Sequence, residues 1–194
     1  LIPLNFIVGA AALAADPVNL VRNPSLEEGA VDATCYKRAG WGTEGDWSFV
    51  QGRLGGRAAS VTLQGHTAGD RKLVQEESTQ CAPAVVPGSG YTIQVWYKST
   101  APVSLTLFRH SAQGWSYWGD IQQQAPAADW TLATAPTPTI PDGTDFLSFG
   151  LSLAIDGTLA TDDYSLTEIP APTQNTTELI INGSLADGTP TPAC

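Results

Sequence analysis

Aromatic side chains are the residues of this sequence best suited to a binding chemistry. The segment FRHSAQGWSYW at 108–118 places Trp115, Tyr117 and Trp118 among polar groups such as Arg109. Trp and Tyr carry a large apolar ring with a polar tip. They therefore suit a pyranose, whose C–H patch can stack on the ring while its hydroxyl groups need polar partners. Packing in a core is the competing explanation for each ring. Arg109, Trp115, Tyr117 and Trp118 are candidate ligand-binding residues.

Two further tryptophans are candidates because of their place in alternating segments. In YTIQVWYKS at 91–99, positions 91, 93, 95 and 97 are apolar and Trp96 falls between them. Successive side chains of a strand point to opposite faces, so Trp96 is expected to project from the face that the core does not need. Trp47, in GTEGDWSFV, is either a further ligand-binding residue or a core residue at the head of a strand.

The elements that must position these side chains are short strands. No segment has a convincing helical period, and alternating apolar runs recur between clusters of Gly, Pro, Asn and Asp. The runs expected to be strands lie at 91–99, 103–110, 115–124, 130–140, 146–155 and 161–169. Many short strands at this spacing predict an all-β fold, an antiparallel β-sandwich.

Catalytic residues are not expected. The two histidines, His66 and His110, lie in no GxSxG or HExxH context. Most acidic residues of interest come as adjacent pairs, and neighbours on a strand point to opposite faces, which makes them a poor acid/base couple. Two carboxylates from different strands could still meet at a cleft, as in a hydrolase or deacetylase fragment. We expect a protein that is not an enzyme.

Acidic residues near both ends of the predicted sandwich suggest calcium. Glu27 lies in NPSLEEG at the start, and Asp162 and Asp163 lie in TDDYSL at the end. First and last strands of a closed sandwich are often neighbours, and Ca²⁺ takes carboxylate and carbonyl oxygens as ligands. These three residues are candidate metal ligands. A solvated acidic turn is the alternative.

Composition narrows the partners and the compartment. Nineteen acidic and nine basic residues give a formal charge of −10, which argues against nucleic acid because phosphate binding needs clustered Lys and Arg. The low share of charged residues is typical of secreted proteins. Of three cysteines, Cys35 and Cys81 can pair as a disulfide, with Cys194 left over. Three free thiols are the alternative.

The ends of the chain predict a repeated architecture. LVRNPSLEEG near the front returns as LIINGSLADG near the end, and Cys35 then falls on Cys194. We interpret 17–168 as one complete module, 169–178 as a linker and 179–194 as the truncated first strand of a second copy.

Residues 1–16 form either a signal-peptide remnant or an apolar N-terminal extension, too short to span a bilayer. The alternation from Ile2 to Val8 is also compatible with a strand that inserts into a neighbouring subunit, so self-assembly through residues 1–10 is an alternative.

Several segments together resemble bacterial carbohydrate-binding modules of families 4, 9 and 22, as appended to secreted polysaccharide deacetylases and glycoside hydrolases. The likeness covers roughly 17–168 and lies in NLVRNPSLEEG, GDRKLV, YTIQVWYKST, FLSFGLSL, TDDYSL and the segment Cys81-Ala82-Pro83. It implies a galactose-binding-like jelly-roll sandwich, a structural Ca²⁺ held by Glu27 with Asp162 or Asp163, and glycan bound on a sheet face or at the loops. Many relatives have a tryptophan after the first cysteine, where this chain has Tyr36.

The sequence as a whole predicts a secreted, non-catalytic protein that binds polysaccharide or glycan through aromatic stacking on a sheet face. We expect it not to bind nucleic acid and not to span a membrane. The alternative is a structural subunit of an extracellular fibre or sheath, joined through its N-terminal strand.

Overall fold

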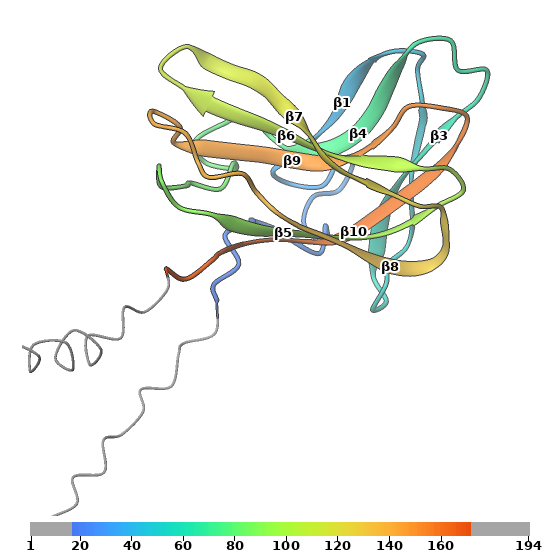
Figure 1. The fold of residues 1–194 in the computed structure, drawn as a ribbon. Coiled ribbons are helices and arrows are strands. Elements are labelled where there is room, and N and C mark those ends of the chain that lie inside the picture. The colour runs from blue at the N-terminus through green and yellow to red at the C-terminus, as the bar shows by residue number, and fades with distance from the viewer. Residues whose placement is uncertain (1–16, 172–194) are drawn as a thin grey trace, which may run out of the picture.

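A computed structural model describes residues 17–171, and these form ten β-strands and no helix (Figure 1). The strands are β1 (Tyr36–Gly42), β2 (Asp46–Gln51), β3 (Arg57–Leu63), β4 (Gly69–Gln75), β5 (Tyr91–Ser99), β6 (Val103–Ser111), β7 (Gly114–Gln124), β8 (Ala127–Pro136), β9 (Phe146–Leu153) and β10 (Gly157–Glu168).

The strands build two five-stranded antiparallel sheets that pack face to face. Sheet A has the order β1-β4-β9-β6-β7, and sheet B has the order β2-β3-β10-β5-β8. Strands distant in the chain are neighbours in each sheet, as β10 is between β3 and β5. This arrangement confirms the predicted all-β jelly-roll sandwich.

The core lies between the sheets and follows from alternation along the strands. In β6, Val103, Leu105 and Leu107 are buried and belong to one hydrophobic cluster. In β9 and β5 the alternate positions 147, 149, 151 and 153, and 91, 93, 95 and 97, join the same cluster. Because each of these strands gives one face to the core, the intervening side chains form the outer surfaces of the sandwich.

A disulfide fixes the entry to the first strand. Cys35, directly before β1, is bonded to Cys81, in the loop after β4, across a sequence separation of 46 residues. The predicted pairing is therefore confirmed. The segment before Cys35 runs beside the last strand, where the Leu20 N–H donates to the Leu166 carbonyl over 2.9 Å.

Several interpretations fall outside the described residues. These are the signal remnant or inserted strand in 1–16, most of the linker at 169–178, and the second copy at 179–194 with Cys194. Within 17–171, no helix is long and apolar enough to cross a membrane.

Candidate functional site

The outer face of sheet A gathers aromatic and polar side chains from all five strands. We define it by Trp41 of β1, Asp70 and Lys72 of β4, Ser148 and Ser152 of β9, Thr106 and Phe108 of β6, and Tyr117 and Asp120 of β7. These side chains share one face for two reasons. Some alternate along their strand with residues that point into the core, and the others lie opposite such outward-facing residues on the neighbouring strand. In Figure 1 the β6–β7 hairpin and the β1–β4 pair rise on opposite sides of β9.

Irregular pairing in β7 decides which of its side chains reach this face. The register between β6 and β7 shifts twice, so that Thr106 lies opposite Asp120 and Phe108 lies opposite Tyr117. Each shift inserts one extra residue into β7, as a β-bulge does. The inserted residues Ile121 and Trp118 pack against the core. Tyr117 and Asp120, three positions apart, consequently share the outer face.

The two most exposed aromatic rings of this face lie on its two edge strands. Trp41 of β1 is 67% exposed and Tyr117 of β7 is 60% exposed. Next to Trp41 the surface is hollowed by a pocket of about 320 Å³, whose lining includes Lys72 and Phe108. Phe108 contacts Tyr117 edge to face, with ring centroids 6.0 Å apart. An apolar surface therefore borders each side of the face.

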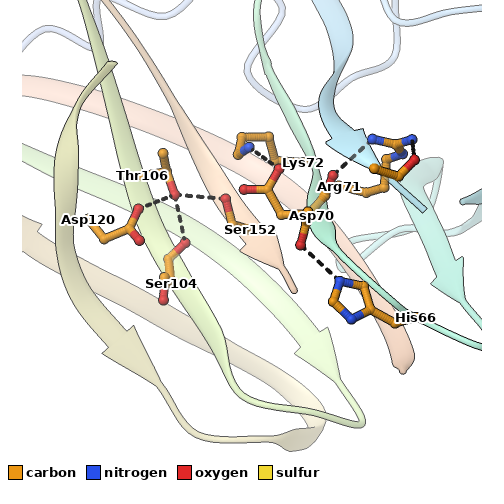
Figure 2. A network of polar contacts seen from close by, with 10 residues as sticks. His66, Asp70, Arg71, Lys72, Ser104, Thr106, Asp120 and Ser152 are labelled. Atoms are coloured by element: carbon orange, nitrogen blue, oxygen red, sulfur yellow. Dashed lines mark hydrogen bonds and ion pairs between the residues drawn. The ribbon is translucent and has the colours of Figure 1, made fainter. Parts of the chain in front are cut away.

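A network of hydroxyl and carboxylate groups occupies the middle of the face (Figure 2). The Thr106 hydroxyl donates to Asp120 Oδ1 over 2.7 Å, and it lies 2.7 Å from the Ser152 hydroxyl. Thr106 is only 1% exposed, whereas Asp120 is exposed. The network therefore fixes the orientation of a carboxylate that remains accessible to a ligand.

A buried lysine lies between this network and Trp41. The Lys72 side chain is 5% exposed, forms an ion pair with Asp70, and places its Nζ 5.8 Å from the Phe108 ring centroid. Because the ammonium group is neutralised by its neighbour, this part of the face carries little net charge.

Gly150 keeps the floor of the face shallow. Gly150 belongs to β9 and lies opposite Thr106 of β6. A Cβ atom at this position would meet the carbonyl oxygen of Leu73, in β4, at 2.1 Å. Only glycine allows β4 to approach so closely here.

Tyr117 is a hydrogen-bond donor at neutral pH. Partial desolvation and the neighbouring Asp120 carboxylate raise the pKa of its phenol. The hydroxyl group therefore stays protonated and can donate to a ligand oxygen.

The outer face of sheet B is a different surface, and its tryptophans are covered by cations. Trp96 pairs with Asp162 of β10, and the Arg53 guanidinium lies 4.3 Å from its ring centroid. Lys98 lies similarly over Trp130, at 5.4 Å. A groove of about 560 Å³ runs beside Lys98 and is lined mainly by small residues. A ligand that stacked on the same face of the Trp96 ring would have to displace Arg53.

The structure separates the six residues predicted to bind ligand. Tyr117 and Trp115 lie on sheet A, with Trp115 against His110 at a centroid distance of 5.2 Å. Trp96 lies on sheet B. The remaining three are Trp47 and Trp118, which pack against the core, and Arg109, whose guanidinium lies 6.0 Å from the Trp118 ring centroid. Trp41 is not among the residues predicted from the sequence, although the adjacent glycines of RAGWG are a signal of an irregular, exposed strand end.

Two of the three predicted metal ligands accept hydrogen bonds from the segment that joins β2 to the first residue of β3. Glu27 Oε1 accepts the Arg57 N–H over 2.9 Å, and Asp162 Oδ2 accepts the Arg53 N–H over 2.8 Å. Asp163 instead forms an ion pair with the Arg53 side chain at 2.7 Å.

Within the described part of the chain, no three His, Cys, Asp or Glu side chains are grouped to hold a metal. Glu27 and Asp162 have the oxygen chemistry that Ca²⁺ prefers, but they fit it only if backbone carbonyls complete the site.

The Asp162 carboxyl group is buried. Desolvation raises its pKa, the Arg53 and Asp163 N–H groups lower it, and the nearby Asp163 and Glu27 carboxylates raise it further. The net shift is upward. A cation near Asp162 would relieve this cost by favouring the ionised form.

Comparison with known proteins relates the chain to carbohydrate-binding modules by structure alone. No protein-family model matches the sequence, and no curated protein matches it. The CBM22-1 xylan-binding domain of Xyn10C from Paenibacillus barcinonensis superposes with a TM-score of 0.54 at 17% identity, over 82% of this chain and 99% of that one. A CBM4 structure gives a TM-score of 0.54 at 18% identity, over 77% and 99%.

A third similar structure belongs to a much larger protein. The enzymatically active domain of tailspike protein 4 from bacteriophage CBA120 matches with a TM-score of 0.56 at 14% identity. The match covers 78% of this chain but 21% of the tailspike chain. The fold shared with the CBM22 and CBM4 structures confirms the structural resemblance expected from the sequence: this chain has the β-sandwich fold of carbohydrate-binding modules.

Proposed function

We propose that the outer face of sheet A binds an uncharged polysaccharide. The observation that carries this proposal is the pair of exposed rings, Trp41 and Tyr117, on opposite edges of a face whose centre is a fixed polar network. The similarity in fold to carbohydrate-binding modules supports it.

The face offers both kinds of contact that a sugar needs, apolar stacking and hydrogen bonding. Pyranose C–H groups would stack on the indole of Trp41 and on the phenol ring of Tyr117. Hydroxyl groups would donate to the accessible oxygen atoms of Asp120, and the Tyr117 hydroxyl would donate to sugar oxygens. Because the lysine of the face is already paired with Asp70, an uncharged chain suits it better than an acidic one.

The same groups argue for binding without hydrolysis. A general acid for glycoside cleavage needs a carboxyl group with a raised pKa beside the scissile bond. Among the described residues, burial raises the pKa of the Asp162 carboxyl, which belongs to sheet B. On the outer face of sheet A, Asp70 and Asp120 are held by Lys72 and Thr106.

Titration calorimetry with soluble xylan and β-glucan oligosaccharides tests the proposal. Trp41→Ala should weaken binding at least about tenfold, since loss of an aromatic contact that anchors the ligand costs roughly 2 kcal/mol. Trp130→Ala, on sheet B, is the matched control and should bind as the wild type does. Equal loss in both variants, or loss only in Trp130→Ala, would reject this face as the site.

Two further properties are part of the proposal. A structural Ca²⁺ bound near Glu27 and Asp162 would join the segment before β1 to β10, because these residues lie on those two elements. Export to an oxidising compartment is supported by the Cys35–Cys81 disulfide.

A further inference from the structure

A second pocket lies on the other side of β1, where the edge strand of sheet A meets the edge strand of sheet B. Its lining consists of Arg38, Ala39, Gly40, Glu44, Trp47 and Arg71, and its volume is about 360 Å³. We call it the edge pocket. It shares Arg38, Ala39 and Gly40 of β1 with the pocket beside Trp41, but it contains none of the residues that define the outer face of sheet A.

Arg71 places a buried cation in the edge pocket. Its side chain is 7% exposed, and two of its N–H groups donate to the backbone carbonyls of Asp70 and Gly42. Its carboxylate partner is Glu44, at 2.8 Å, and the Glu44 side chain is 91% exposed. A buried guanidinium group is thus neutralised by a carboxylate that is almost entirely in water. Such an exposed partner is held weakly.

Arg38 and Trp47 complete the wall. The Arg38 guanidinium lies 5.6 Å from the Trp47 ring centroid and forms an ion pair with Asp32, also at the surface. Guanidinium groups bind carboxylates in a fork geometry. β1 pairs only with β4, so alternate residues along its free edge present backbone N–H and C=O groups that are available to hydroxyl groups.

We propose that the edge pocket binds the carboxylate-bearing sugar of an acidic glycan, a uronic acid residue. Its carboxylate replaces that of Glu44 on Arg71 and reaches Arg38, while the sugar ring lies against Trp47 and the free edge of β1. This site goes beyond the uncharged-glycan site on sheet A and does not depend on it.

The test is NMR titration of the isotope-labelled protein with D-glucuronate at millimolar concentration, with D-glucose and acetate as parallel ligands. Glucuronate should shift the signals of Arg38, Arg71 and the Trp47 indole. Glucose lacks the carboxylate and acetate lacks the ring, so both should bind at least about threefold more weakly.

Glu44→Gln gives a result that loss of folding cannot imitate. Because Glu44 competes with the ligand for Arg71, its removal should tighten glucuronate binding about twofold to fivefold. Glu28→Gln makes the same charge change at another exposed position and is the matched control. Arg38→Gln should weaken binding about threefold or more.

Three results would overturn the proposal: no glucuronate shifts at these residues, acetate binding as tightly as glucuronate, or Glu44→Gln behaving like Glu28→Gln. Trp41→Ala separates the two sites, because it should weaken binding of uncharged oligosaccharides and leave glucuronate binding unchanged.

Discussion

Thr106 supports the polar centre of sheet A, so its hydroxyl group should affect both stability and binding. Thr106→Val keeps the shape of the side chain and removes a donor that lies 2.7 Å from Asp120 and 2.7 Å from Ser152. A hydrogen bond to a charged group contributes about 1.5–3 kcal/mol. Because the exposed Asp120 regains water when the bond is lost, we expect a decrease of about 1–2 kcal/mol in the free energy of unfolding.

Glycan affinity should fall in the same variant, because Asp120 loses the contact that orients it while Trp41 and Tyr117 remain. Urea unfolding measures the first effect and calorimetry measures the second. Thr134→Val, at an exposed position of β8, is the control and should change neither. If Thr106→Val unfolds and binds as the wild type does, the network does not position the ligand-binding carboxylate.

Three other perturbations follow from the structure. Replacing Cys35 and Cys81 by alanine should lower the free energy of unfolding by about 4 kcal/mol, since the disulfide closes a loop with a separation of 46 residues; an unchanged urea midpoint would contradict this. Burial raises the pKa of the Tyr36 and Tyr164 phenols, so the folded state keeps protons that the unfolded chain releases above about pH 10. Stability is therefore fully present below that pH and should fall above it by about 1.4 kcal/mol per pH unit for each tyrosine, whereas a flat profile of urea midpoints from neutral to alkaline pH would refute it. If Ca²⁺ is bound as proposed, a saturating concentration of about one hundred times the Kd should stabilise the fold by about 2.7 kcal/mol, seen as a higher Tm that Glu27→Gln abolishes; a Tm insensitive to both Ca²⁺ and chelator would exclude the site.

Much of the sandwich could be predicted from regular alternation. The segment 91–99 is β5 with its expected faces, and 146–155 contains β9. Both strands are flanked by neighbours on both sides and place alternate residues in the core, which imposes a period of two on their apolar side chains. In the region of β1 to β4 the sequence predicts only a possible strand beginning near Trp47, which is β2. Glycines and charged residues interrupt the apolar period of β1 and β4, whereas β3 does alternate, at Ala59, Val61 and Leu63, and could have been predicted.

The candidate site was harder to predict because it depends on departures from regularity. Two shifts in register move Trp118 to the core and bring Tyr117 and Asp120 to one face, and nothing in WSYWGDIQQQ marks where they fall. The cation over Trp96 comes from Arg53, whose position is set by an ion pair with Asp163 across 110 residues. Contacts at such separations leave no local pattern.

The six tryptophan indole N–H signals provide the most direct test that sheet A carries the glycan site. They can be followed in a single NMR titration with a xylan or β-glucan oligosaccharide that binds. If the site lies on sheet A, the Trp41 signal should shift with saturation while those of Trp96 and Trp130 stay in place. Shifts of Trp96 or Trp130 with an unmoved Trp41 would contradict it and assign the sugar to sheet B.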